Sequence, residues 1–498
     1  MPDREIECEV PPLRIRVEKD APVNPDGRYV LYWMIACRRS AWNFSLQRAA
    51  AWGQRLGKPI LVLEALRCNY SWASDRLHAF AVQGMADNQR SFAPSGVRYY
   101  PYLEPQPGAG AGLFERLAAD ACVAVTDDWP CFFLPKLVRA ARRQVNVRFE
   151  SIDSNGLLPM RAAEKVFARA FDLRRFLQKE LRNHIDAMPA EDPLAGAELP
   201  NSPRIDRATL DRWPEADVAA IAADPALLSS FPIDHTVEPA PLVGGERSAR
   251  SQLEGFLNDR LPLYGEQRNQ PQCDAASGLS PFLHWGHLSA HETFVRLAER
   301  ERWNPGKMAA KPTGARGWWG MGESAEAFLD ELVTWRELGF NMCSQRRDYD
   351  RYESLPNWAQ QTLAEHASDK REHVYTLQQF ETAQTHDPLW NAAQRQLVAE
   401  GKIHNYLRML WGKKILHWSA SPRDALRVMV HLNNKYALDG RDPNSYSGIF
   451  WVLGRYDRAW GPERPIFGKI RYMTSENTAR KLKVGDYIRS YGPQRELF

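Results

Sequence analysis

Apolar runs that alternate with helix-like stretches constrain the fold of the first third of this chain. Five short runs read as buried strands, at residues 29–35, 60–63, 97–100, 122–127 and 147–150. Helical stretches lie between them, at residues 41–56, 74–92 and 134–143. Strands that are apolar throughout and alternate with helices usually pair in parallel, with both faces of the sheet covered. The sequence therefore predicts a doubly wound, Rossmann-like α/β sheet.

The crevice at the carboxyl ends of such strands often binds a nucleotide. Neither the GxGxxG fingerprint of dinucleotide sites nor the GxxxxGK[ST] phosphate loop occurs in the sequence. A dinucleotide-dependent dehydrogenase is therefore disfavoured.

The rest of the chain predicts a second domain of a different class. A length of 498 residues exceeds what a single core usually holds. Helical signals dominate from residue 244 onward, after a stretch rich in Pro, Ala and Asp that reads as a linker with short helices. The predicted division is a loosely held N-terminal extension (1–27), an α/β domain (28–185), a linker (186–242) and an all-helical domain (243–498).

Composition excludes several classes of protein. The sequence has no run of about 18 uncharged apolar residues and no basic start followed by an apolar core, so we expect a cytoplasmic protein without a membrane span. Its seven cysteines are scattered without a CxxC pair, which predicts free thiols and no metal site. A net charge of +4 is too small to indicate a nucleic-acid partner by itself. Seventeen tryptophans suit a core, a flat cofactor or an unstacked base equally.

The most specific sequence motifs lie between residues 385 and 451. It comprises THDPLWN at 385–391, RMLWGKKILHW at 408–418 and NNKYALDGRDPN at 433–444. Apolar residues recur at helical spacing over residues 402–418, which predicts one buried helix. Trp411 and Trp418 are about two turns apart on it and should point to the same side. A single tryptophan in such a helix is ordinarily core packing.

Together with DKREHVY at 369–375, these motifs resemble the cryptochrome/photolyase family, and specifically the class II cyclobutane pyrimidine dimer photolyases. The resemblance is weak over the N-terminal sheet and dense from residue 244 to about residue 487. It implies an α/β domain, a long linker and a helical domain that binds FAD. It also implies DNA repair by blue light, in which excited reduced FAD passes one electron to a flipped-out dimer and regains it after the ring opens.

Two segments resemble those that hold FAD in this family, GGERSAR at 244–250 and ASGLSPFLHWG at 276–286. From the residues alone, Gly-Gly before a helix is ordinarily a turn and the serines ordinarily N-caps, although amides at a helix start also suit a phosphate. The resemblance implies four FAD contacts in this region: Tyr264, Ser277, Leu279 and Ser280. It also implies that Arg408 and Asp439 form an ion pair beside the flavin, with Asn433 facing the reactive edge of the ring. An aspartate there also suits a helix terminus.

The predicted substrate site begins with Glu331 and Trp335, which are four residues apart and would share a helix face. By pattern alone they suit a surface glutamate with a tryptophan packed beneath it. The resemblance implies that Glu331 hydrogen-bonds the dimer and that Trp335, Met409 and Trp451 touch it.

The resemblance further implies an electron-transfer chain that reduces oxidised FAD, from Trp411 near the flavin through Trp390 to Trp418 toward solvent. Leu410 stands where relatives often have an oxidisable tyrosine, which leaves Tyr375 as a terminal donor. A second departure is His404-Asn405, where relatives commonly have His-Gly.

Residues 455–473 interleave basic and aromatic side chains, which suits either a solvated face or contacts to phosphates and bases. The resemblance implies that this region enters the gap left by the flipped dimer. The expected DNA contacts, besides the two tryptophans of the substrate site, are Arg458, Lys469 and Arg471, with Arg471 in the gap.

Other functions remain open at this point. A cryptochrome-like photoreceptor would share the fold and the flavin but signal through a partner, and repair of the (6-4) photoproduct would require a histidine pair that His404 or His431 could join. The resemblance also leaves room for a second, light-harvesting chromophore of deazaflavin or folate type near residues 126–128. We expect a monomer that acts on double-stranded, UV-damaged DNA in the cytoplasm, at the nucleoid.

Overall fold

The computed structural model describes residues 10–493, which form two compact units. The sheet unit comprises the described residues up to Glu164, with Gln178–Glu254 and Leu279–Lys307. The helical unit comprises Lys165–Leu177, Gly255–Gly278 and the described residues from Met308 onward. The boundaries between these compact units differ from the predicted domain boundaries. The predicted domains stay a prediction.

The sheet unit is built on six strands in the order β1-β6-β5-β2-β3-β4 among the described residues. The strands are β1 (Ile15–Lys19), β2 (Tyr29–Met34), β3 (Ile60–Leu66), β4 (Arg98–Leu103), β5 (Ala121–Asp127) and β6 (Phe149–Ile152). All but β1 run parallel, and every residue of β2 is buried. The predicted α/β sheet is therefore confirmed.

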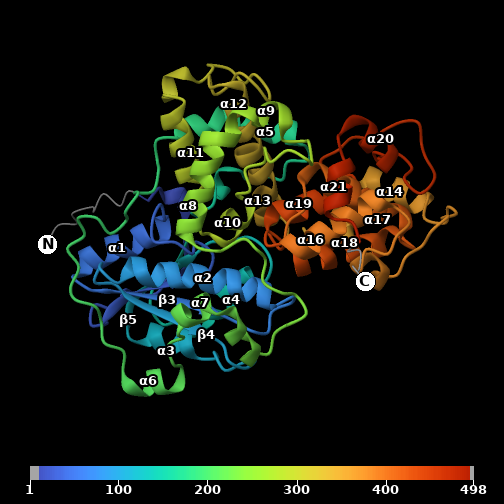
Figure 1. Cartoon of the computed structure of the whole chain (residues 1–498). Coiled ribbons are helices and arrows are strands. Elements are labelled where there is room, and N and C mark those ends of the chain that lie inside the picture. The colour runs from blue at the N-terminus through green and yellow to red at the C-terminus, as the bar shows by residue number, and fades with distance from the viewer. Residues whose placement is uncertain (1–9, 494–498) are drawn as a thin grey trace. The chain divides into compact units, whose positions relative to one another are not determined.

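Helices cover both faces of this sheet, because right-handed crossovers between parallel strands leave a helix on one face or the other. In Figure 1, α1 (Phe44–Leu56) and α2 (Asp75–Phe92) run above the strands and α3 (Leu113–Ala119) below them. The remaining α-helices of this unit are α4 (Leu134–Gln144), α6 (Arg207–Arg212), α7 (Val218–Ala223), α10 (Ser280–Trp285) and α11 (Ala290–Arg300), and α8 (Glu246–Gly255) ends at a unit boundary. Within the stretch expected to be a linker, α7 packs against α2.

Strand β1 corrects one expectation. Residues 1–27 were expected to be loosely held, but Ile15–Lys19 pairs antiparallel with β6 at the edge of the sheet. Its residues are exposed or half-buried, so the strand lacks the apolar run that marks the others. Residues 1–9, including Cys8, lie outside the described residues.

The side chain of Asp127 lies at the carboxyl ends of the neighbouring strands β2 and β5. It accepts hydrogen bonds at 2.8 to 2.9 Å from the Tyr32 hydroxyl and from the backbone amides of Ile35, Ala36 and Cys37. Amides at this point of a doubly wound fold commonly face a ligand's phosphate. Here the chain's own carboxylate satisfies them.

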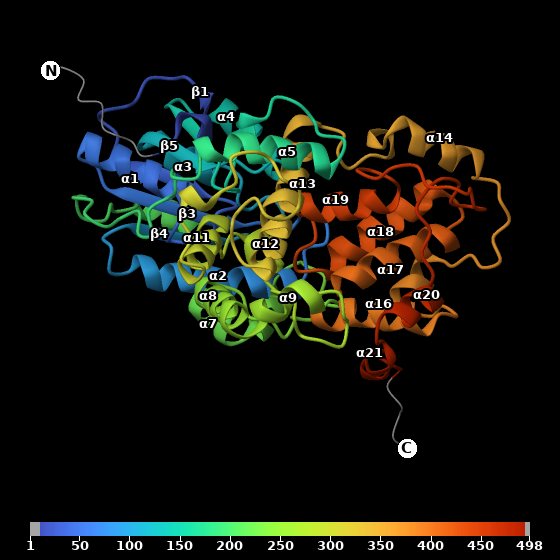
Figure 2. The same cartoon turned by 90° about the horizontal axis from the view of Figure 1, so that it is seen from above.

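The helical unit is organised around four consecutive helices that lie side by side (Figure 2). They are α16 (Pro388–Glu400), α17 (Asn405–Trp418), α18 (Pro422–Tyr436) and α19 (Pro443–Val452). The unit also contains α9 (Leu261–Gln267), α12 (Glu323–Leu329), α13 (Arg336–Gln345), α14 (Asn357–Glu365), α15 (Leu377–Glu381), α20 (Ser475–Lys481) and α21 (Gly485–Ser490), while α5 (Ala170–Glu180) spans a unit boundary.

None of the helices within residues 10–493 is both long enough and apolar enough to cross a membrane. Within the same residues no group of three or more His, Cys, Asp or Glu side chains is placed to hold a metal ion, and the described cysteines are free thiols.

Candidate active site

Helix α17 brings four of the predicted site residues onto one element: Arg408, Met409, Trp411 and Trp418. The helix lies very close to α18 and α19 because Gly412 has no side chain. A β-carbon at this position would lie 2.6 Å from Val452 Cγ2 and 3.1 Å from Met429 Sδ. The glycine therefore sets the distance between α17 and the helices that carry Asn433 and Trp451.

Arg408, Asn433 and Asp439 form a polar trio at one end of these helices. The Arg408 guanidinium donates to Asn433 Oδ1 at 3.1 Å and to both carboxylate oxygens of Asp439 at 3.3 Å. The amide nitrogen of Asn433 donates to Ser445 Oγ at 2.6 Å, which fixes the orientation of the amide. The predicted ion pair between Arg408 and Asp439 is present.

The polar trio is chemically suited to the polar edge of a flavin ring. The side chains of Arg408 and Asp439 are 17% and 16% exposed and so are partly open to a ligand, whereas Asn433 is 2% exposed. The carbonyl oxygen of Asn433 accepts from Arg408 and keeps a second acceptor position, because an amide oxygen has two lone pairs. The donor set therefore fits a ring that carries N–H and carbonyl groups.

Of the tryptophans predicted to carry electrons, Trp411 and Trp418 are on α17 and Trp390 is on the neighbouring α16. Trp390 Nε1 donates to the backbone carbonyl of Trp411 at 3.0 Å, and the ring centroids of Trp390 and Trp418 are 6.0 Å apart. The ring of Tyr375 follows at 5.7 Å from that of Trp418. Trp418, expected toward solvent, is only 2% exposed, whereas Tyr375 is half-buried. The row of rings therefore reaches solvent at Tyr375.

Trp451, at the end of α19, is half-buried between two cations. Lys413 Nζ lies 5.9 Å from the centre of its ring, and the Arg471 guanidinium lies 5.7 Å from it. Lys413 also donates to the Val452 carbonyl at 2.6 Å, and its burial lowers the pKa of this amine to about 7. The Arg471 guanidinium is 5.2 Å from the ring of Trp460. Two of the predicted DNA contacts, Trp451 and Arg471, are thus in contact with each other.

Two further predicted DNA contacts, Arg458 and Lys469, lie in the same loop region as Arg471. The Arg458 guanidinium stands 4.4 Å from the centre of the Trp460 ring, while Lys469 pairs with Glu463 at 3.1 Å. Arg458 and Lys469 are both exposed.

Glu331 and Trp335 lie on η7 (Asp330–Trp335), a π-helical turn between α12 and α13. The predicted shared face assumed a regular α-helix, and the wider π turn changes that spacing. π turns inside helices are frequent at functional sites. Burial raises the pKa of Glu331 to about 7, against the opposing effect of Arg268. Helix α13 then approaches α19 closely, because a β-carbon on Gly339 would lie 2.7 Å from the Pro443 carbonyl.

The residues predicted to hold the rest of FAD fall into both units. Tyr264, 7% exposed on α9, and Ser277 belong to the helical unit. Leu279, 1% exposed, and Ser280 belong to the sheet unit, at the start of α10. Their roles stay a prediction.

The backbone amides of the Gly-Gly step bind the chain's own side chains rather than facing a phosphate. Gly244 N–H donates to Gln83 Oε1 at 2.6 Å and Gly245 N–H to His287 Nδ1 at 2.9 Å. A β-carbon on Gly244 would lie 2.1 Å from the Phe80 carbonyl oxygen. The step therefore serves as a close contact with α2, and the phosphate interpretation of these amides is wrong.

Three residues that the sequence analysis missed contact the predicted ones. Gln394 Oε1 accepts from Trp411 Nε1 at 2.9 Å, Lys413 lies beside Trp451, and His386 Nδ1 is 2.6 Å from the Tyr375 hydroxyl. Lys413 was missed because lysine is usually exposed, and no local pattern in the sequence marks this one as buried.

Comparison with known proteins gives the following results. No protein-family model matches the chain. The chain is 33% identical over 465 residues to the deoxyribodipyrimidine photo-lyase of Methanothermobacter thermautotrophicus, across 93% of this chain and 94% of the relative. It is 34% identical over 493 residues to the protein of the same name from Oryza sativa subsp. japonica, across 95% and 89%. A bacterial class III photolyase from Agrobacterium tumefaciens has a similar fold, with a TM-score of 0.67 at 16% identity, across 93% of this chain and 86% of that one.

Proposed function

Because the chain belongs to the deoxyribodipyrimidine photo-lyases of the cryptochrome/photolyase family, we propose that it is a class II enzyme that splits cyclobutane pyrimidine dimers in DNA. The observation that supports the proposal is that one helix, α17, carries both Arg408 of the polar trio and two of the three tryptophans, Trp411 and Trp418. The trio suits a flavin, and the tryptophans suit its reduction by light.

The predicted residues would bind the cofactor and the dimer. Bound FAD would supply a light-excited electron donor that the protein alone lacks. Arg408 and Asp439 would hold its ring, and Asn433 would offer an amide oxygen to the ring's N–H edge. Trp335 and Trp451, with Met409, receive the flipped dimer, whose unstacking costs a few kcal/mol and less for a lesion that already distorts the duplex.

Basic residues would hold the DNA around the flipped dimer. Arg458 and Lys469 are exposed and can reach phosphates, a contact that weakens as salt rises. Arg471 would leave its place beside Trp451 to fill the gap in the duplex.

Glu331→Ala is the first test of this function. A carboxyl that hydrogen-bonds the dimer stabilises added electron density, so its removal should lower the repair yield by about tenfold or more. The measurement is recovery of thymines from a synthetic dimer-containing oligonucleotide under blue light, with the flavin reduced beforehand. Unchanged FAD content and unchanged DNA affinity in the variant would confine the loss to the repair step. A wild-type protein that binds FAD and leaves the dimer intact would overturn the proposal in favour of a photoreceptor.

The repair yield should also depend on pH through Glu331. Its pKa of about 7 means that the carboxyl is protonated below neutral pH and can donate a hydrogen bond to the dimer's carbonyl. Above that pH it is an anion, which cannot donate and repels added negative charge. The yield should therefore fall as pH rises through about 7, and Glu331→Gln should flatten the profile because an amide donates without titrating. A profile of the same shape in both proteins would contradict this role.

A further inference from the structure

Tyr375 ends the row of aromatic rings with a hydroxyl that contacts a single histidine, His386. The hydroxyl lies 2.6 Å from His386 Nδ1, and the backbone N–H of the same histidine donates to it at 3.1 Å. The hydroxyl oxygen accepts from this amide, and its own proton points to the imidazole when the ring proton of His386 is on Nε2. His386 is exposed, so a proton that arrives there can pass to water.

We propose that His386 is the proton acceptor that allows Tyr375 to donate the last electron in light-driven reduction of the flavin. This inference rests on the proposed function and deepens it. Loss of an electron makes a phenol strongly acidic, so tyrosine oxidation is favourable only when the proton has somewhere to go. The hydrogen bond to His386 provides that acceptor before the electron leaves.

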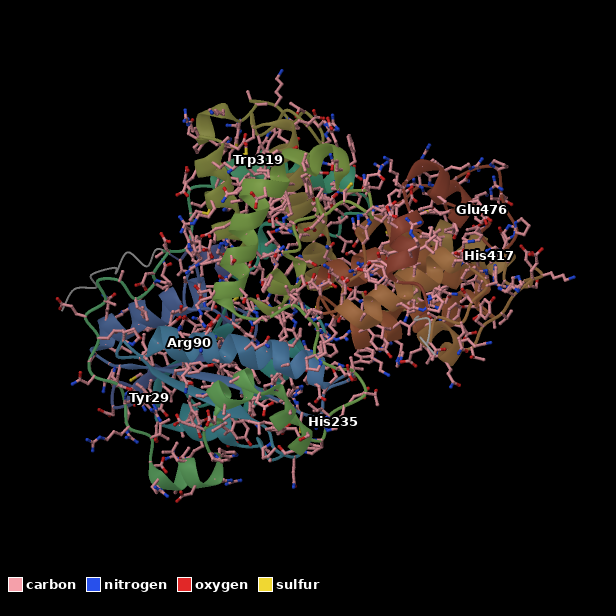
Figure 3. All side chains as sticks on the ribbon, in the orientation of Figure 1. Tyr29, Arg90, His235, Trp319, His417 and Glu476 are labelled. Carbon is pink, nitrogen blue, oxygen red and sulfur yellow. The ribbon has the colours of Figure 1, made fainter. Side chains whose placement is uncertain are left out.

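His386 can accept a proton because it is neutral at physiological pH. Partial burial lowers the pKa of His386, and nearby His373 and Lys414 lower it further, against smaller opposing effects of Asp387 and Glu372. His417, labelled in Figure 3, also faces this region from α17, and its burial lowers its pKa to about 4, so it adds no positive charge. With its proton on Nε2, the neutral ring of His386 presents Nδ1 as an acceptor.

The proposed electron path ends at Tyr375. Trp411 would give an electron to a light-excited oxidised flavin and regain one from Trp390. Trp390 would in turn regain one from Trp418, which is left as a radical cation. Tyr375 gives one electron to Trp418, which becomes neutral. The O–H bond of Tyr375 breaks and its proton binds Nδ1 of His386, leaving a neutral tyrosyl radical and an imidazolium. The imidazolium then releases a proton to water.

The test compares the wild-type holoprotein with Tyr375→Phe, His386→Asn and a control, His373→Asn. His373 is an exposed histidine whose ring is 4.0 Å from that of His386. After a light flash, we expect a tyrosyl radical, detected by electron paramagnetic resonance, in the wild type and in His373→Asn. General bases typically contribute about 10²–10⁴-fold. Because water can partly replace an exposed base, we expect tyrosyl formation in His386→Asn to slow by about tenfold.

Four further measurements separate proton acceptance from a structural role. The wild-type rate should show a solvent deuterium isotope effect and should fall only at acidic pH, below the ordinary histidine pKa of about 6.5, because the pKa of His386 is lowered. In His386→Asn the fall at acidic pH should vanish and the isotope effect should change, because water then accepts the proton. Imidazole in solution should restore the rate of His386→Gly, because the site is exposed. Nitrogen resonances of His386, which need no light, should shift in Tyr375→Phe.

Equal tyrosyl formation in the wild type and His386→Asn, with the same isotope effect, would overturn the inference. So would a wild type that repairs dimers but forms no tyrosyl radical, which would leave the proposed function intact. A protein that forms the radical but repairs nothing would overturn the repair proposal alone.

Discussion

Trp390→Phe should abolish light-driven reduction of the oxidised protein while leaving repair by the previously reduced protein unchanged. Trp390 is fully buried, and it contacts Trp411 through its indole N–H and Trp418 through its ring. Phenylalanine is far harder to oxidise, so electrons could no longer pass between these two neighbours. Bleaching of flavin absorbance under blue light measures the first property, and dimer repair after chemical reduction in the dark measures the second.

Trp318→Phe is the matched control for that variant. Trp318 is 2% exposed in the same unit, and its ring is 4.8 Å from that of Trp319. Both substitutions remove part of a buried ring and should cost about 2 kcal/mol of stability. Only Trp390→Phe should lose photoreduction. Reduction of Trp390→Phe at the wild-type rate would exclude this tryptophan from the electron path.

Asp439→Ala should weaken binding of oxidised FAD by about 10²–10³-fold. Removing one partner of a buried ion pair costs about 3–5 kcal/mol, and each 1.4 kcal/mol is about tenfold in affinity. In the free protein Arg408 and Asp439 are 17% and 16% exposed. The proposed flavin would cover them further and leave Arg408 without its counter-charge. The titration should use oxidised FAD, whose ring is neutral. The reduced ring is an anion, and its attraction to the unpaired Arg408 guanidinium would partly offset the loss of affinity.

Glu381→Ala provides the comparison. Glu381 pairs with Lys435 at 2.8 Å, with side-chain exposures of 23% and 17% that resemble those of the first pair. Loss of either carboxylate should lower the melting temperature by a similar amount, while FAD titration should separate the two variants. Equal FAD affinity in Asp439→Ala and the wild type would remove the polar trio from the cofactor site.

The sheet was predictable because its strands are buried on both faces. Val30, Leu31 and Tyr32 are fully buried, and such a strand needs a continuous apolar run that is visible in the sequence. Strand β1 was not predictable by the same rule, since an edge strand that keeps polar residues such as Arg16 exposed leaves no such run.

Site residues that belong to long sequence motifs could be predicted. Site residues whose environment depends on tertiary contacts could not. The pairing of Arg408 with Asp439 was implied by resemblance, and the structure contains it. The burial of Lys413 depends on Val452 and Trp451, which are far along the chain, and no local pattern encodes it. Likewise, the amide of Gly245 is taken by His287, a residue whose proximity only the fold creates.

The interleaving of the two units along the chain has a consequence for synthesis on the ribosome. The sheet unit includes Leu279–Lys307, so it cannot be complete until the chain has been made at least that far. Domains that are continuous in sequence usually fold one after another during translation, at about 5–20 residues per second. Here the last strand ends at Ile152, and more than a hundred further residues must be synthesised before α10 and α11 are available to pack in this unit. The apolar surfaces that these helices cover are therefore exposed in the nascent chain, where a chaperone would find its binding site.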